Sequence, residues 1–422
     1  MHHFKYKHHQ LYCEHVSVAA IAERVGTPVY IYSYQTLIDH YTKLVQAFKP
    51  VAPLVCFAVK ANSNLAVLRA LVNAGAGLDI VSGGELYKAM RVGCDPGKIV
   101  FASVGKTDHE IREALRIGIL LFNVESLQEL ETIDRIAAHM GKTAPVALRI
   151  NPGVEVETHA HITTGGHGHK FGIDFDTAEQ MLRERARFGH VHIKGLHLHI
   201  GSQITEAAPF LQAISKVAEL LAKASTLGAA IEYLDIGGGL GIIYREDDHP
   251  QTAKEYAQAV LPVLKKLNVK VILEPGRFIA GNAGILVTRV LYLKAAEQKT
   301  FVVVDAGMND LIRPALYGAY HEIQPVTQDP HADGHVVADI VGPVCETGDA
   351  FAKDRKMAPV KPADCLAVMG AGAYGFAMAS HYNSRPNAAE VLVRGEQYFL
   401  VRRREKSQDL IRHEIIPQEL WT

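Results

Sequence analysis

The sequence predicts a (β/α)8 barrel of the TIM type together with a second, mostly β domain. Three observations support this fold class. The chain has 422 residues, more than a single hydrophobic core usually accommodates. Eight short apolar runs alternate with amphipathic stretches up to about Gly281. Beyond that point strand-like runs follow one another with little helix between them.

The predicted barrel strands are short runs rich in β-branched and aromatic residues. They are Leu54–Val59, Leu78–Val81, Ile99–Ala102, Leu120–Val124, Val146–Ile150, Ile193–Ile200, Tyr233–Ile236 and Val271–Leu273. Helical patterns lie between them, among them Asn64–Ala74, Gly84–Val92, Asp108–Ile117, Ser126–Met140 and Pro209–Leu227. Strict alternation indicates parallel strands with crossover helices. Eight units favour a closed barrel over the alternative, an open doubly wound sheet, which suits fewer units and a clearer GxGxxG motif.

The predicted β domain combines the two ends of the chain. Its strands are Gly284–Leu293, Thr300–Asp305, Val336–Gly342, Cys365–Met369 and Gln397–Arg402. The early run Pro28–Tyr32 precedes the first barrel helix and can pair with them, which makes this domain discontinuous. We therefore expect a barrel domain over residues 34–280 and a β domain formed by residues 1–33 and 281–422.

Composition excludes several function classes. Lys plus Arg number 44 against 45 Asp plus Glu, so no global field gathers nucleic acid or an anionic membrane. The five cysteines are spread without a CxxC pair, which argues against a disulfide framework and against a structural zinc site. The sequence shows neither a signal-peptide pattern nor an apolar run of about 18 residues. We expect a cytoplasmic protein without nucleic-acid or membrane partners.

Candidate reactive residues follow the predicted strands, because the sites of such barrels form at the carboxyl ends of the strands. Lys60 follows the first strand, where burial favours the free amine that Schiff-base chemistry needs, although a surface ion pair is the commoner role of a single lysine. The glycine-rich turn Gly237–Gly241 follows the seventh strand and suits either a phosphate or simply a tight turn. Gly276 and Arg277 offer a second phosphate-binding group after the eighth strand.

Glu274 ends the eighth strand, where a buried carboxylate needs a partner such as the pyridinium of a cofactor. His199 can stack on a flat ring, but it can equally be an ordinary core histidine. A zinc hydrolase is a rival interpretation, since His-x-His motifs at strand ends bind zinc in some barrels. Its candidate ligands are His197 and His199 with His159, His161, His167 and His169. That interpretation explains neither Lys60 nor the glycine-rich turn.

Further motifs extend along nearly the whole chain. In combination they are Phe57–Asn62, His199–Gln203, Glu274–Arg277, Asp305–Pro314, Gly342–Glu346, Gly372–Gly375 and Tyr382–Pro386. With these motifs the chain closely resembles the pyridoxal-phosphate-dependent decarboxylases of the alanine-racemase fold type. The resemblance implies pyridoxal 5'-phosphate as cofactor and no metal. It also implies a carboxy-lyase that converts a small amino acid, meso-2,6-diaminopimelate, to L-lysine and CO2, the last step of lysine biosynthesis.

The resemblance implies a role in cofactor binding for several residues. Lys60 would form the Schiff base, Glu274 would keep the pyridine nitrogen protonated, and His199 would lie against the ring. The remaining cofactor-binding residues would be Ser202, Gly239, Gly276 and Arg277 around the phosphate, with Pro275 and Tyr374.

The resemblance also implies which residues bind substrate. Arg313, Tyr317 and Glu346 would hold the distal carboxylate and amine, and Arg277 and Tyr374 would also contact substrate. Cys345 would donate a proton to Cα after CO2 leaves, although a free cysteine is more often a small buried hydrophobe. In this family Cys345 and Glu346 reach the cofactor of the partner subunit, so a homodimer with shared sites is implied.

Two other functions on the same fold remain open. One is decarboxylation of another basic amino acid or a carboxy-polyamine, but such enzymes tend to have Asp after the catalytic cysteine, so Glu346 with Arg313 favours diaminopimelate. The other is a non-enzymatic carrier of pyridoxal phosphate, which usually lacks the β domain.

Overall fold

The computed structural model describes residues 2–154, 170–297, 299–331 and 334–421. It confirms the predicted fold class, a closed eight-stranded barrel with a separate mostly β unit. One unit comprises Leu37–Gly281, and the other comprises Met1–Thr36 with Asn282–Thr422. No helix in the described part of the chain is long and apolar enough to cross a membrane.

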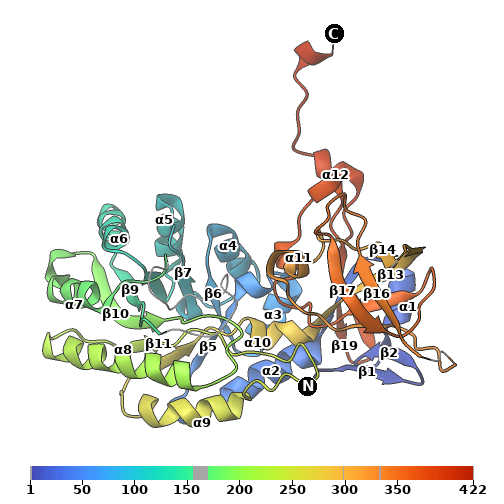
Figure 1. Ribbon diagram of the computed structural model, residues 1–422. Helices are drawn as coiled ribbons and strands as arrows, with labels where there is room; N and C mark the ends of the chain where they lie inside the picture. The colour runs from blue at the N-terminus through green and yellow to red at the C-terminus, as the bar shows by residue number, and fades with distance from the viewer. Residues whose placement is uncertain (1, 155–169, 298, 332–333, 422) are drawn as a thin grey trace. The chain divides into compact units, whose positions relative to one another are not determined.

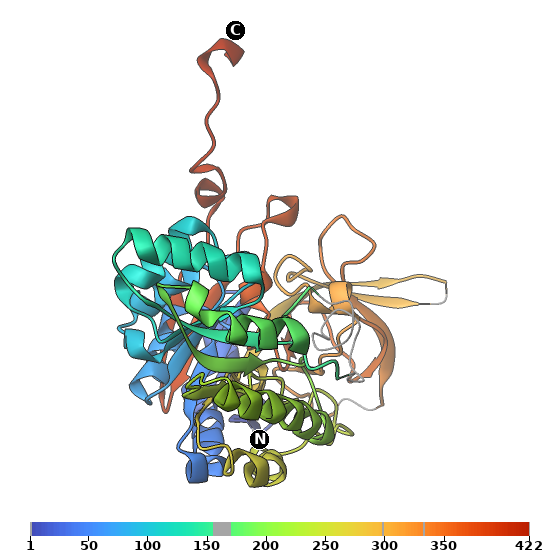
Figure 2. The same ribbon diagram turned by 90° about the vertical axis from the view of Figure 1, so that its left-hand side faces the viewer.

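The barrel strands are parallel and close in the order β10-β11-β12-β5-β6-β7-β8-β9. They are β5 (Leu54–Ala58), β6 (Gly77–Ile80), β7 (Ile99–Ala102), β8 (Leu121–Val124), β9 (Ala144–Ile150), β10 (Val191–Leu198), β11 (Tyr233–Asp235) and β12 (Lys270–Leu273). Helices lie outside this ring of strands (Figure 1, Figure 2). They are α2 (Tyr34–Ala47), α3 (Leu65–Asn73), α4 (Gly83–Arg91), α5 (Asp108–Ile117), α6 (Leu127–His139), α7 (Phe175–Arg183), α8 (Ala208–Thr226) and α9 (Ala253–Leu264).

Local sequence signals explain where the barrel helices begin. The side chains of Asn64, Ser82, Thr107 and Ser126 each accept a hydrogen bond from a backbone N–H in the first turn of the following helix. Inside the ring, small and branched side chains from five strands fill the barrel core. They are Cys56, Val100, Leu121, Ala147 and Ile272. The capped helices and the packed interior leave the carboxyl ends of the strands as the place for polar residues.

The β unit is built around β4 (Val29–Ser33), which comes from the N-terminal segment. It pairs in antiparallel fashion with β13 (Gly284–Ala295) and in parallel with β19 (Ala389–Arg394). The predicted pairing of the early run with the C-terminal third is therefore confirmed. Further strands and short helices complete the unit: β1 (Phe4–Lys7), β2 (Gln10–Cys13), β3 (Val16–Ser17), α1 (Val18–Val25), β14 (Thr300–Val304), α11 (Arg313–Tyr317), β15 (Ile323–Pro325), β16 (Val336–Val341), β17 (Ala350–Met357), β18 (Cys365–Val368), β20 (Gln397–Arg402) and α12 (Ser407–Ile411).

Three strands of this sheet, β15, β17 and β19, are absent from the sequence prediction, and β15 is only three residues long. β17 is mostly polar and lies at an edge of the sheet, where an apolar pattern is not required. β19 carries Glu390, which interrupts its apolar run although the residue is only 2% exposed. The hydroxyl of Tyr32 donates a hydrogen bond of 2.7 Å to this carboxylate, so the neighbouring strand supplies a partner for the buried Glu390.

Candidate active site

The first element of the site is a lysine paired with a buried aspartate. Lys60 lies in the short 3-10 helix η2 (Val59–Ala61) directly after β5, and Asp79 is in the neighbouring strand β6. The Nζ atom of Lys60 donates to Oδ2 of Asp79 at 2.7 Å. Burial, reinforced by the charge of Glu274 and opposed by that of Lys60, raises the pKa of Asp79 to about 7. The lysine amine thus has a partner that can itself release or hold a proton near neutral pH.

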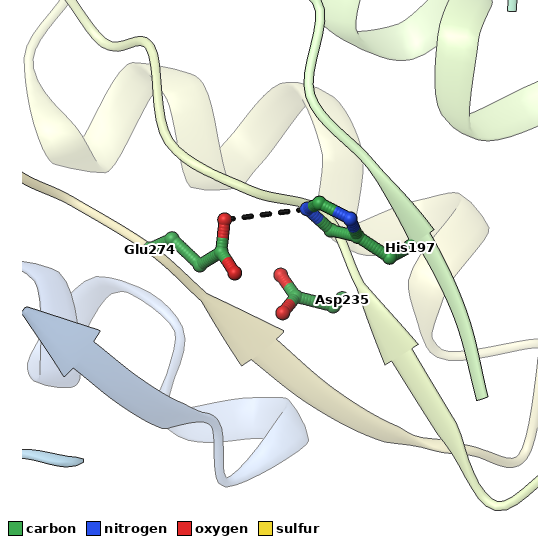
Figure 3. Close-up of side chains that lie close together, drawn as sticks. All are labelled: His197, Asp235 and Glu274. Carbon is green, nitrogen blue, oxygen red and sulfur yellow. Dashed lines mark hydrogen bonds and ion pairs between the residues drawn. The ribbon is translucent and has the colours of Figure 1, made fainter. Parts of the chain in front are cut away.

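Glu274 follows β12 and is held by two donors from other strands (Figure 3). The amide of Asn123 in β8 donates to Oε1 at 3.1 Å, and Nε2 of His197 in β10 lies 3.3 Å from Oε2. Burial alone would raise the pKa of Glu274, but the charges of His197 and Lys60 lower it below its usual value. The geometry therefore favours an ionised carboxylate with fixed orientation.

Asp235, the last residue of β11, is the third buried carboxyl group of the site. Its Oδ1 accepts the N–H of Gly237 at 2.9 Å. Burial, followed by the charge of Glu274, raises the pKa of Asp235 well above its usual value. Burial and the charge of Glu274 thus both favour the neutral form of Asp235.

His199 lies just beyond the end of β10, and its ring is fixed by a backbone contact. The N–H of Gly238 donates to Nδ1 at 3.2 Å. Burial, with the positive charges of Arg149 and Lys60, lowers the pKa of His199 well below its usual value. The imidazole is neutral at physiological pH, which suits a ring that stacks on another flat ring.

The glycine-rich turn after β11 has no room for side chains. Gly237 and Gly239 adopt φ angles of +66° and +114°. A Cβ atom on Gly238 would lie 2.2 Å from the carbonyl oxygen of Glu274, and one on Gly239 would lie 2.6 Å from that of Gly201. The backbone can therefore come close to a ligand here, which fits the predicted phosphate-binding role.

Arg277 is 7% exposed and oriented by two hydroxyl groups. Its Nε and Nη2 atoms donate to the hydroxyl of Ser202 at 3.1 and 3.0 Å, and Nη1 donates to that of Tyr244 at 2.7 Å. Arg277 begins the four-residue helix α10 (Arg277–Ala280), directly after Pro275 and Gly276. The structure thus brings together Ser202 and Arg277, two of the residues predicted to bind phosphate.

The remaining predicted residues belong to the β unit. Arg313, at the start of α11, is buried, and its Nη1 lies 2.9 Å from Nε2 of His321. Tyr317 ends the same helix and is half-buried, as is Tyr374. Cys345 and Glu346 lie exposed in the connection between β16 and β17, where the N–H of Cys345 donates to Oδ1 of Asn383 at 2.8 Å.

Asp79, Asn123, His197 and Asp235 are absent from the predicted cofactor and substrate site, and His197 was considered only as a zinc ligand. Each is a polar residue in or at the end of an otherwise apolar barrel strand. That placement was a usable signal, because an apolar strand seldom buries a polar group without a partner. Which partner each one meets depends on how the barrel closes.

The structure allows a test of which ligand these residues suit. Four of the buried polar atoms that lack a hydrogen-bond partner among the described residues belong to these strand residues: Oδ1 of Asp79, Oδ1 of Asn123, Nδ1 of His197 and Oδ2 of Asp235. Unpaired buried polar groups indicate a polar ligand at this end of the barrel. An amine, an ionised carboxylate, a neutral imidazole and a glycine-rich turn with an arginine suit an aromatic phosphate-bearing cofactor.

One group of residues partly agrees with the zinc interpretation. His197, Asp235 and Glu274 each offer one ligand atom within 4.8 Å of the others. This set does not include His199, whose Nδ1 contacts the backbone instead. His159, His161, His167 and His169 lie outside the described residues.

Comparison with known proteins agrees with the geometry. Residues 34–281 match the family model "Pyridoxal-dependent decarboxylase, pyridoxal binding domain". The chain is 49% identical to diaminopimelate decarboxylase of Pseudomonas aeruginosa over 98% of its own length and 99% of that protein. The crystal structure of diaminopimelate decarboxylase from M. jannaschii in co-complex with L-lysine has a TM-score of 0.94 at 37% identity, covering 99% and 98% of the two chains. The Helicobacter pylori enzyme complexed with L-lysine has a TM-score of 0.90 at 39% identity, covering 94% of this chain and 98% of that one.

Proposed function

This chain belongs to the pyridoxal-dependent decarboxylases, within the diaminopimelate decarboxylase family, and on that premise we propose that it converts meso-2,6-diaminopimelate to L-lysine and CO2. The observation that supports this most strongly is that one end of the barrel holds both a lysine amine, paired with Asp79, and a buried glutamate whose pKa is lowered. The cofactor is pyridoxal 5'-phosphate, which when bound supplies an electron sink for the electron pair left on Cα as CO2 departs.

The residues of the barrel would hold that cofactor. The amine of Lys60 would bond to the aldehyde carbon of the cofactor, and Asp79 would exchange a proton with that amine. Glu274 would accept the N–H of the pyridine nitrogen and keep the proton on that atom. The neutral ring of His199 would lie against the cofactor ring.

Binding of the phosphate would fall to the turns after β10, β11 and β12. Arg277 offers a guanidinium already oriented by Ser202, and backbone at Gly239, Pro275 and Gly276 can approach closely. Tyr374 would also contact the cofactor.

Substrate recognition would depend on the opposite charges of Arg313 and Glu346. A guanidinium suits the distal carboxylate of diaminopimelate and a carboxylate suits its distal amine, with Tyr317 beside them. Cys345 would deliver a proton to Cα after CO2 leaves, since a thiol can act as a general acid.

Cys345 and Glu346 are exposed, which supports a proposal of shared sites. We propose a homodimer in which these two residues complete the site of the other subunit. We further propose that the protein works in the reducing cytoplasm, because all five cysteines, each in the described part of the chain, are free thiols.

Turnover is tested by incubating the protein with pyridoxal phosphate and following CO2 release from meso-diaminopimelate, L-ornithine, L-lysine and L-arginine. We expect release from diaminopimelate alone, with L-lysine as the product. Turnover of one of the other three instead would keep the cofactor but overturn the roles of Arg313 and Glu346. Arg313→Ala should lower diaminopimelate turnover by about 10- to 100-fold.

Subunit sharing is tested by mixing two inactive variants, Lys60→Ala and Cys345→Ala, in equal amounts under conditions that allow exchange. If the site is shared, hybrid dimers contain one intact site, and activity returns to roughly a quarter of the wild-type value. A mixture that stays inactive although hybrid dimers form would place both residues in a site within one subunit.

A further inference from the structure

Two carboxyl groups, those of Asp235 and Glu274, lie next to each other deep in the barrel (Figure 3). Asp235 and Glu274 come from the neighbouring strand ends of β11 and β12, and their side chains face each other with His197 beside them. One ligand atom of each of the three lies within 4.8 Å of the others. Two ionised carboxylates at this distance and burial would repel each other strongly, so the pair calls for a proton.

The hydrogen bonds indicate which carboxyl group holds this proton. Both oxygens of Glu274 receive donors, one from Asn123 and one from His197. Asp235 receives only the N–H of Gly237, and its Oδ2 has no partner among the described residues. Donors stabilise an ionised carboxylate, whereas an oxygen without a donor is the natural site of the O–H of a neutral acid.

We propose that Asp235 is a positioning residue that stays protonated and donates its O–H to Glu274, so that Glu274 remains ionised and correctly oriented for the pyridine nitrogen of the cofactor. This role in catalysis rests on the function proposed above, but the protonation of Asp235 does not. Asp235 itself need not touch the cofactor, because it acts through Glu274.

The surrounding charges support this assignment. The groups that bear on the pair are Glu274 itself, Asp79, Lys60 and His197. Burial and the negative charge of Glu274 raise the pKa of Asp235, while the positive charges of His197 and Lys60 lower that of Glu274. Both effects move the proton toward Asp235.

A neutral Asp235 matters for the proton on the pyridine nitrogen. If Asp235 were ionised, its charge would draw a proton onto Glu274, and a neutral Glu274 could no longer stabilise a protonated pyridine nitrogen. A protonated Asp235 prevents this and also restrains the carboxylate of Glu274 from a third direction. We therefore expect the side-chain amide of asparagine, a permanent donor of similar shape, to replace Asp235.

The protonation state is measured by infrared spectroscopy on the cofactor-free protein, at about two pH units above the pKa of about 7 of Asp79, so that Asp79 is mostly ionised. We expect the carbonyl band of a protonated carboxylic acid in the wild type, shifted in D2O, absent from Asp235→Asn and retained in Asp79→Asn. A wild type without this band, or loss of the band in Asp79→Asn instead, overturns the proposal. So does a band that disappears on stoichiometric zinc binding at this cluster in the purified protein.

The positioning role is measured by cofactor affinity and by the 15N resonance of pyridoxal phosphate labelled at the ring nitrogen. Asp235→Asn should keep the dissociation constant within about twofold and keep the resonance of a protonated ring nitrogen. Asp235→Leu, similar in size but without a donor, should raise the dissociation constant about tenfold or more and shift the resonance toward the unprotonated form.

Two outcomes of this second experiment contradict the proposal. If Asp235→Asn loses as much cofactor affinity as Asp235→Leu, the negative charge of Asp235 is needed. If Asp235→Leu keeps the affinity and the 15N resonance of the wild type, Asp235 has no positioning role. If the wild type failed to bind pyridoxal phosphate at all, the proposed function would fail, while the infrared result on Asp235 would still stand.

Discussion

Two lysines follow barrel strands in this protein, and their surroundings differ sharply. Lys106 follows β7 and is fully buried. Its amine donates to the carbonyl oxygens of Ser103 and Asn123 and to the carboxylate of Glu129, at 2.6 to 2.9 Å. Lys60 follows β5, and its side chain is 37% exposed beside the buried Asp79. The first lysine is enclosed by its partners, and the second is accessible.

The carboxylates near the two lysines differ in the same way. Around Lys106, Glu129 accepts the N–H of Glu125, and Glu125 in turn pairs with Arg149 at 2.8 Å and accepts the N–H of Gly172. Beside Lys60, by contrast, Asp79 keeps a buried oxygen without a partner among the described residues. A saturated network stabilises the fold, whereas unpaired buried atoms indicate where a ligand binds. Satisfaction of hydrogen bonds, and not residue type, therefore distinguishes Lys106 from Lys60, the lysine proposed to bind the cofactor.

The largest effect is expected from replacing Lys60, and its absence would contradict the comparison between the two lysines. Lys60→Ala should reduce turnover by about four orders of magnitude or more, because no other amine replaces the covalent attachment of the cofactor. Steady-state decarboxylation of diaminopimelate measures the loss, with folding checked by circular dichroism. Activity within about tenfold of the wild type would remove Lys60 from the site.

Replacement of Lys106 should instead lower the stability of the fold. Lys106→Met should lower the free energy of unfolding by about 3–5 kcal/mol, because Glu129 and its neighbours lose a buried cation. Urea unfolding of the cofactor-free protein measures the change. The matched variant Lys60→Met should cost far less, since Asp79 can hold a proton instead. Equal losses in both variants would contradict the distinction between the two lysines.

A third test measures how the free energy of unfolding changes with pH as Asp79 titrates. In the folded protein its pKa is raised from 3.8 to about 7, so the folded state keeps a proton that the unfolded chain releases between those values. The free energy of unfolding should therefore fall as the pH rises through this window, by on the order of 4 kcal/mol. Asp79→Asn cannot titrate, and the difference between its urea-unfolding pH profile and that of the wild type isolates the effect. Parallel profiles would argue against the raised pKa.

The smallest effect is expected at Arg277, the arginine proposed to bind the cofactor phosphate. Ser202→Ala removes the hydroxyl that accepts two hydrogen bonds from Arg277, so the guanidinium loses part of its orientation. We expect cofactor affinity to fall by about 1 kcal/mol, or roughly fivefold. Fluorescence titration with pyridoxal phosphate measures it, and Ser202→Thr, which keeps the hydroxyl, serves as the control. A larger loss in Thr than in Ala would indicate a steric cause.

The sequence alone determined the fold class and much of the candidate site. Alternating short apolar runs and amphipathic helices predicted the barrel, and the position of each reactive residue after a strand predicted that Lys60, His199 and Glu274 meet at one end. These conclusions need only local periodicity and the rule that parallel strands end on the same side. Polar strand ends are visible in the same way, although their partners are not.

Only the tertiary structure decided which polar groups pair and which stay unpaired. Lys60 and Lys106 look alike in sequence, yet the carboxylate and carbonyl groups around each come from different strands of the closed ring. The proton on Asp235 depends on the strand ends β11 and β12 lying side by side. Distances across the barrel set the burial, charge and hydrogen bonding of each group, and no short stretch of sequence contains them.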